Sequence, residues 1–283
     1  MANLEVLRAR VDELAERDWD LPAIEARFNK IEAEGFTGRD LNQAETVSKK
    51  PEILDRVQRR AEEYCYLTRN CAKGSATALL EEFGLGNLEI IKALAPFPGL
   101  GMTGGICGPV AGGLVVLGLY FSSDDVISYE SADHYLAARE YTRRFEKELG
   151  SLLCPKIQEV VFGKYFDPMA SLENLEKFNK AHAREKCPIA PGIGARIAAE
   201  IIIEDLEKKV ERRFADAAAA YVRLKFKFSK YLTYSCGLNF HLPRFQQNYW
   251  FCRGLVLAFV VRWLTRMAKT KSSPAPRPNG TYL

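Results

Sequence analysis

Four cysteines, each at the predicted start of a helix, constrain this chain more than any other feature of its sequence. Cys71 follows Asn70, a good helix cap, and Cys107 follows a glycine-rich stretch. Cys154 and Cys187 are each followed by proline, which is favoured at the first position of a helix. A helix N-terminus carries partial positive charge and free N–H donors, so a thiol placed there loses its proton more readily. Four such cysteines within about 120 residues predict one shared site.

The apolar residues of the first 220 positions recur mostly with helical spacing. Leu4, Leu7, Val11 and Leu14 follow a three- and four-residue spacing, which predicts an amphipathic helix. The stretch 222–229 alternates polar and apolar residues, but an isolated strand would have no partner, so we expect a helical extension there. We therefore predict an all-α fold, with helices at about 4–16, 20–35, 51–68, 106–121, 131–150, 155–162, 170–184 and 191–220 and others that start at Cys71 and Asn87.

The segment 106–121 interleaves glycine and alanine with valine and leucine. Small residues let a neighbouring backbone approach closely, so we expect a central buried helix; about 20 residues would be needed to span a bilayer. We divide the chain into an N-terminal helical extension (1–62), a compact multi-helix domain with the four cysteines (63–215), a basic, aromatic C-terminal extension (216–271) and a flexible tail (272–283).

The N-terminus reads as a charged amphipathic segment with no apolar core of a signal peptide, so we expect a cytoplasmic protein. In a reducing compartment, seven cysteines are a poor match to a disulfide framework. Metal ligands, catalytic thiols and buried core cysteines are the better interpretations.

Residues 65–205 resemble the C-GCAxxG-C-C family of redox-active proteins, which four cysteines and a Cys-Gly-Ala-x-x-Gly motif define. The matching motif is Cys107-Gly-Pro-Val-Ala-Gly112, in which Pro109 replaces the usual alanine. Asn70-Cys71-Ala72 is similar to the segment around the first cysteine of the family, and Cys154 and Cys187 correspond to its last two. The resemblance covers roughly half of the chain.

The resemblance implies a redox protein, in electron transfer or as an oxidoreductase. A related domain lies beside haem domains in some cytochromes, where it is associated with an iron–sulfur cluster. We accordingly expect Cys71, Cys107, Cys154 and Cys187 to hold a cluster of unknown nuclearity, because helix N-termini would donate N–H groups to its sulfurs. The chain lacks Cys-x-x-Cys-His, so covalent haem is not indicated. The wide spacing of the cysteines also disfavours zinc, whose ligands come in close pairs.

Three alternatives stay open at this point. The four cysteines could form a metal-free thiol–disulfide oxidoreductase, be plain core cysteines, or belong to a non-catalytic subunit that docks to a membrane or a partner enzyme. Cys65 is a reserve ligand or, with Cys236 and Cys252, a buried core cysteine. His182 is a solvent-facing helical residue or a further ligand. The glycine-rich stretch 99–105 lacks the lysine of a phosphate-binding loop.

The charge of the chain is strongly asymmetric. Residues 217–283 contain eleven Lys and Arg and no Asp or Glu; because the whole chain is +4, residues 1–216 carry −7. Residues 221–271 also contain many aromatic side chains, a combination typical of a helix on an anionic membrane surface or against a protein. We expect a redox partner protein, with a homo-oligomer open and nucleic acid disfavoured, because no known nucleic-acid-binding fold is indicated.

Overall fold

The structure is a computed structural model that describes residues 4–36, 42–123, 125, 127 and 132–235, with side chains up to residue 221. The chain divides into two compact units, Met1–Ala219 and Ala220–Leu283. The site lies in the first unit, and most of the second lies outside the described residues. Cys236, Cys252 and the basic, aromatic stretch beyond residue 235 fall among the residues that are not described, so the predictions made for them stay predictions.

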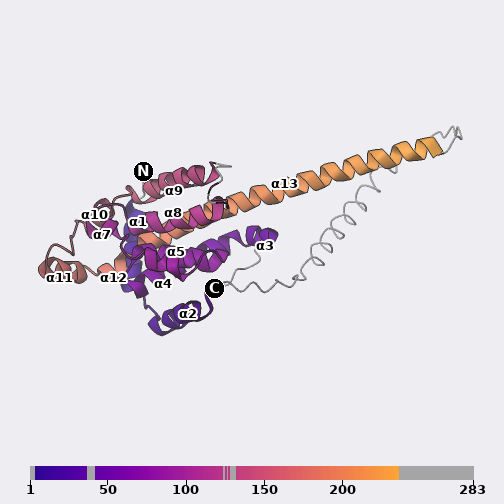
Figure 1. The fold of residues 1–283 in the computed structure, drawn as a ribbon. Coiled ribbons are helices and arrows are strands. Elements are labelled where there is room, and N and C mark those ends of the chain that lie inside the picture. The colour runs from indigo at the N-terminus through magenta and orange to yellow at the C-terminus, as the bar shows by residue number, and fades with distance from the viewer. Residues whose placement is uncertain (1–3, 37–41, 124, 126, 128–131, 236–283) are drawn as a thin grey trace. The chain divides into compact units, whose positions relative to one another are not determined.

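The described residues are helical, as predicted, and contain no strand beyond a single β-bridge. Figure 1 labels the helices in chain order. They are α1 (Leu4–Glu16), α2 (Leu21–Glu34), α3 (Gln43–Ser48), α4 (Lys50–Thr68), α5 (Cys71–Phe83), α6 (Leu88–Ala93), α7 (Gly99–Met102), α8 (Gly108–Phe121), α9 (Asp133–Leu149), α10 (Cys154–Phe162), α11 (Leu172–Lys180), α12 (Ala183–Lys186) and α13 (Ile189–Ser235).

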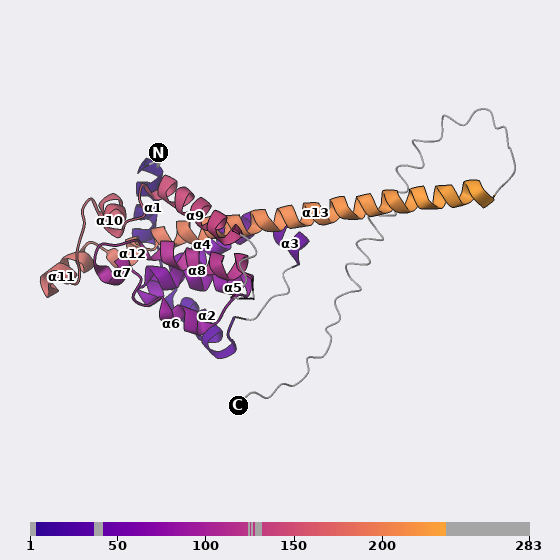
Figure 2. The same cartoon turned by 45° about the horizontal axis from the view of Figure 1, so that its top comes forward.

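The start of α13 packs among α4, α5, α8 and α9, which contact one another in that order (Figure 2). Ile202 and Ile203 of α13 are fully buried. Ion pairs reinforce the same packing: Arg144 of α9 reaches Glu204 at 2.9 Å, and Lys50 of α4 reaches Glu207 at 3.2 Å. The helices around the site are thus held by both apolar burial and ion pairs.

The helix α8 is central and rich in small residues, as predicted. Gly112 lies so close to α5 that a Cβ there would be 2.6 Å from the carbonyl oxygen of Ala72. On another side, Gly113 lies directly against the ring of Tyr141, whose hydroxyl donates to the carbonyl of Pro109 at 2.7 Å. Close backbone approach of this kind needs residues without a Cβ. The small residues of α8 therefore set how closely the cysteine-bearing helices approach.

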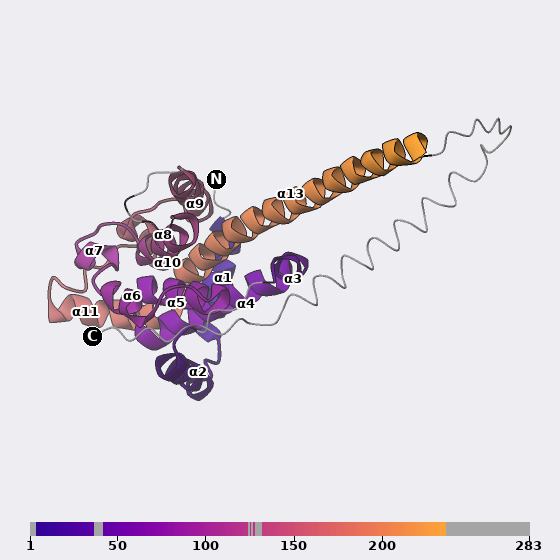
Figure 3. The same ribbon diagram turned by 45° about the vertical axis from the view of Figure 1, so that its right-hand side comes forward.

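The N-terminal helices pack directly on the helices that carry the cysteines. Leu7, Val11 and Leu14 of α1 are buried, and α1 contacts α10 and α12. After α1, the ring of Trp19 stacks on Tyr66 at 4.4 Å, and the guanidinium of Arg184 lies over the same tyrosine ring at 4.2 Å. The α1–α2 connection is thereby tied both to the end of α4 and to α12. Figure 3 shows α1 passing behind α4 and α5.

The structure departs from the predicted helices in three places. The predicted helix 170–184 is interrupted at His182, which adopts a left-handed conformation with φ of 59° and separates α11 from α12. Two short helices, α3 and α7, lie where none was expected.

The last helix was expected to extend past residue 220 and does so as one helix to Ser235, which confirms the helical interpretation of 222–229. No helix within the described ranges has the length and apolar character that crossing a bilayer requires.

Candidate redox site

The site is assembled by a single antiparallel β-bridge between Ile106 and Leu153. The N–H of Cys107 donates to the carbonyl of Leu152 at 2.8 Å, and the N–H of Cys154 donates to that of Gly105 at 2.9 Å. Each bonded cysteine then leads into its own helix: Cys107 caps α8, and Cys154 is the first residue of α10. Two cysteines that are 47 residues apart in the chain therefore become neighbours.

The thiols of Cys107 and Cys154 hydrogen-bond to each other. This hydrogen bond is the main reason that the pKa of Cys154 falls to about 7, well below the ordinary value of a thiol. The same bond, together with a hydrogen bond to Cys71 and burial, raises the pKa of Cys107. Cys107 is thus the donor and Cys154 the accepting thiolate. Because Cys154 is only half-buried whereas Cys107 is 5% exposed, the thiolate is the accessible partner.

Gln158 provides a second hydrogen bond to the thiolate. It lies one turn after Cys154 on α10, and its Nε2 donates to the Sγ of Cys154 at 3.6 Å. Its Oε1 accepts the backbone N–H of Phe166 at 2.9 Å, which fixes the orientation of the amide. Gln158 is buried, with 5% of its surface exposed. Nothing in the sequence singled out Gln158 except its position four residues after a cysteine, which places both on one face of a helix.

Cys71 lies on the other side of Cys107. It is the first residue of α5, where Asn70 caps the helix by accepting the N–H groups of Ala72 and Lys73 at 3.1 and 3.0 Å. Its Sγ lies directly against Gly108, the glycine of the Cys-Gly pair. The glycine of the motif is therefore the residue that lets α8 approach the first cysteine.

Cys187 and Cys65 complete the group of thiols. Cys187 is the C-cap of α12, and the long helix α13 begins two residues later at Ile189, so, contrary to the prediction, this cysteine does not itself start a helix. Burial raises the pKa of Cys187, and so do the charges of Cys71 and Cys154. Burial likewise raises the pKa of Cys65, with further contributions from Cys71 and Cys187. Cys65 is therefore a buried cysteine, as expected, but one that adjoins the site.

A position at the start of a helix does not by itself lower the pKa of these thiols. The sequence predicted easier loss of the proton at each of the four cysteines. The pKa of Cys154 is lowered, whereas the pKa values of Cys107 and Cys187 are raised. Hydrogen bonding and burial outweigh the effect of the helix dipole at the last two positions, because a buried thiolate is poorly solvated.

The thiols gather near one another without forming a metal-binding arrangement. An all-cysteine donor set would suit an iron–sulfur cluster chemically. Within the part of the chain that the structure describes, however, no three or more His, Cys, Asp or Glu side chains are placed so that they could hold a metal ion. The iron–sulfur cluster and its four cysteine ligands therefore stay a prediction.

The glycine-rich stretch lies against the thiolate. A Cβ built on Gly99 would lie 3.6 Å from the Sγ of Cys154, and Gly105 accepts the N–H of that cysteine. His182, in contrast, is a solvent-facing side chain, 67% exposed, with Nδ1 3.9 Å from Glu185. The loop is thus part of the site. His182 is solvent-facing, which is the first of the two roles predicted for it.

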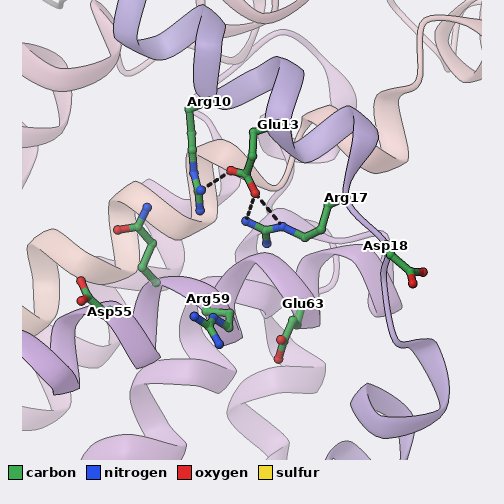
Figure 4. Close-up of a pocket in the computed structure, with 8 residues that line it drawn as sticks. Arg10, Glu13, Arg17, Asp18, Asp55, Arg59 and Glu63 are labelled. Atoms are coloured by element: carbon green, nitrogen blue, oxygen red, sulfur yellow. Dashed lines mark hydrogen bonds and ion pairs between the residues drawn. The ribbon is translucent and has the colours of Figure 1, made fainter.

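A separate polar pocket of about 690 Å³ lies between α1 and α4 (Figure 4). In Figure 4, Glu13 bridges Arg10 and Arg17. Both arginines also reach the fully buried carboxylate of Glu62, at 3.0 and 2.7 Å. The ion pairs of these two arginines with Glu62 fasten α1 to α4 three residues before Cys65.

Residues 69–201 match the model of the family described as putative redox-active protein (C_GCAxxG_C_C). The match covers all four predicted site cysteines and supports a redox role for this part of the chain. The resemblance seen in the sequence is therefore confirmed over this range. No curated protein and no solved structure matches the chain.

Proposed function

We propose that residues 69–201 carry a thiol–disulfide redox centre in which Cys154 is the attacking thiolate and Cys107 the resolving thiol. The observation that carries the proposal is the bridge between Ile106 and Leu153, whose flanking backbone hydrogen bonds make Cys107 and Cys154 neighbours, together with the amide of Gln158 that donates to the Sγ of Cys154. The lowered pKa of Cys154 and the raised pKa of Cys107 agree with this division into an attacking and a resolving thiol. A nucleophilic thiol is most effective when its pKa lies near the ambient pH, and about 7 meets that condition.

The reaction follows from this division of roles. The thiolate of Cys154 attacks one sulfur of a substrate disulfide; the S–S bond breaks, and the departing sulfur takes up a proton. Cys107 then loses its proton and attacks the Sγ of Cys154, which releases the second substrate sulfur as a thiol. The substrate gains two electrons and two protons, and Cys107 and Cys154 become a disulfide. A protein dithiol is the partner that would reduce this disulfide again.

The surrounding residues have supporting roles in this scheme. Gln158 stabilises the thiolate before attack, because its amide donates to the sulfur. Cys107 is buried, which protects the resolving thiol from reagents that have not first reacted with Cys154. The hydrogen bond to Cys71 raises the pKa of Cys107, so it keeps the resolving thiol protonated until Cys154 has reacted.

An iron–sulfur protein is the second candidate function. What favours it is that Cys71 adjoins Cys107 on one side and Cys65 and Cys187 on the other, so that the predicted ligands border one region. A bound cluster would supply one-electron transfer. In that case the helix starts of α5, α8 and α10 would orient the ligand cysteines Cys71, Cys107 and Cys154.

The experiment that separates the two candidates is anaerobic purification followed by visible spectroscopy, iron and sulfide analysis, and thiol titration. The thiol–disulfide proposal predicts an iron-free, colourless protein that loses two titratable thiols on oxidation and regains them with dithiothreitol. Cys107→Ser and Cys154→Ser should each abolish this two-thiol change. A coloured protein that contains iron and sulfide, and is bleached by Cys107→Ala, would overturn the proposal in favour of a cluster.

A further inference from the structure

Three large apolar side chains are exposed around the thiolate of Cys154. Leu153, next to it in the chain, is 46% exposed; Leu100 in the glycine-rich loop is 45% exposed, and Tyr165 is 37% exposed. We call these three residues the thiol rim. Exposed apolar residues are ordinary when scattered, but a cluster around a reactive group marks a contact surface.

One residue of the thiol rim, Leu100, has a strained backbone conformation. Leu100 has φ of 50° and ψ of 68°, a left-handed conformation that is unfavourable for leucine. Its side chain rests on Gly105, where a Cβ would lie 2.8 Å from it. On the other side of the loop, Gly104 lies close to Pro155 and to the hydroxyl of Tyr165. Strain of this kind persists where the surrounding structure imposes it, which is typical of functional sites.

Further exposed apolar residues lie on α11 and just before it. The connecting residue Met169 is 73% exposed, and Leu172 and Leu175 of α11 are 82% and 39% exposed. The helix α11 is amphipathic yet has no buried residue. Its Phe178 ring makes an edge-to-face contact with Phe162 and a tilted contact with Phe166, which attaches it to the end of α10. Figures 1 and 2 place α7, α10 and α11 at the same end of the first unit.

The thiol rim itself is uncharged, and the cations near it are engaged. The ammonium group of Lys156 pairs with Glu159 at 2.8 Å, and that of Lys164 lies over the ring of Phe166 at 4.9 Å. A small anionic disulfide such as glutathione disulfide would therefore gain little electrostatic attraction at this site. An uncharged apolar segment complements it better, because such a segment gives up no solvated charge on docking.

We infer that the thiol rim and the exposed face of α11 form a docking surface for an uncharged, apolar segment of a protein that carries the substrate disulfide. This inference rests on the proposed function for the disulfide. The docking itself is a separate property, because apolar contacts do not require the thiols to react. A protein segment is favoured because the exposed apolar residues are spread over α7, the start of α10 and α11, which lie at the same end of the first unit (Figures 1 and 2).

Binding of S-methylated insulin B chain tests the docking without any redox step. The wild-type protein should bind the fluorescently labelled peptide. Leu100→Asn should weaken binding about tenfold, because asparagine tolerates the left-handed backbone but removes the apolar contact. Leu172→Ser should act in the same direction, and its high exposure keeps the test valid if the Leu100 variant does not fold. Leu136→Ser, at a leucine of α9 whose exposure of 63% lies between those of Leu100 and Leu172, should bind as the wild type does.

A parallel assay compares the rates at which insulin and glutathione disulfide are reduced. Faster reduction of insulin, lost in the Leu172 variant, supports both the docking and the redox proposal. Peptide binding without reduction of either disulfide would overturn the proposed function alone. Equal binding by the wild type, Leu172→Ser and Leu136→Ser would overturn the docking surface. The docking surface would also be overturned if the wild-type protein failed to bind the peptide and sedimentation showed a dimer of the chain that buries this surface.

Discussion

Gly108 lies directly against the Sγ of Cys71, so that a Cβ at residue 108 would overlap the sulfur and lie 2.7 Å from the backbone nitrogen of Ala72. A residue without a side chain is therefore needed after Cys107 because Cys71, which lies 36 residues before Cys107 in the chain, occupies the space that a Cβ would take. The contact brings the starts of α5 and α8 together, and with them the first two cysteines.

Replacing Gly108 by alanine should lower the free energy of unfolding by about 1–3 kcal/mol, because the added methyl group would force α5 and α8 apart. Gly118 is the matched control: it lies in the same helix, and a Cβ there meets nothing within 4 Å. Gly118→Ala should stabilise the protein by about 0.5–1 kcal/mol, as alanine is the better helix former. Chemical denaturation measures both; equal effects of the two variants would contradict this explanation.

The reactivity of Cys154 should depend on pH with a midpoint near 7. Since the pKa of this thiol is lowered to about 7, the thiolate fraction and the alkylation rate rise as pH increases through that value. Iodoacetamide labelling read by mass spectrometry gives the profile for this residue, and Cys154→Ser identifies the signal. A midpoint at or above about 8.5, the value of an ordinary thiol, would contradict the assigned hydrogen bonds.

Gln158→Leu should raise the pKa of Cys154 by about one unit. The variant removes a hydrogen bond to a charged sulfur, worth about 1.5 kcal/mol, and one pKa unit corresponds to nearly that energy. Alkylation at pH 7 should slow accordingly, whereas the rate at high pH should be unchanged. Gln158→Glu should raise the pKa further, because a carboxylate would then face the thiolate. A lower pKa in either variant would remove Gln158 from the site.

Glu62→Gln should lower the free energy of unfolding by about 3 kcal/mol, since it removes the charge that Arg10 and Arg17 share in a buried position. The exposed pair of Glu89 and Lys92 provides the control. Glu89→Gln should leave the denaturation midpoint unchanged within error. If Glu62→Gln unfolded at the same denaturant concentration as the wild type, the ion pairs would not be what fastens α1 to α4.

Much of the fold could be predicted from local signals. The predicted helices at about 4–16, 20–35 and 51–68 agree with α1, α2 and α4 to within one residue at each end, and Asp20 and Gly35 cap α2. The interruption at His182 could not be predicted, because a left-handed histidine leaves no pattern in the sequence. The short helix α7 was missed for a related reason: its φ angles at Leu100 and Gly101 are positive, and for leucine this conformation is not indicated by any sequence pattern.

The four cysteines could be singled out from the sequence, whereas the proximity of Cys107 to Cys154 could not. Helix-starting positions and the Cys-Gly motif identified Cys71, Cys107, Cys154 and Cys187. That Cys107 and Cys154 are partners depends on the bridge between Ile106 and Leu153, a contact between two loops with no strand pattern to reveal it. The protonation of each thiol depends on burial and hydrogen bonds, which are tertiary properties.

The measurement that tests the central claim most directly is disulfide mapping. The full chain is oxidised with diamide, its free thiols are blocked with N-ethylmaleimide, and its peptides are identified by mass spectrometry without reduction. The proposed redox centre predicts that the peptide with Cys107 is linked to the peptide with Cys154, and that dithiothreitol reverses the link. Both cysteines recovered as blocked thiols, or Cys107 linked to Cys71 with Cys154 free, would contradict it.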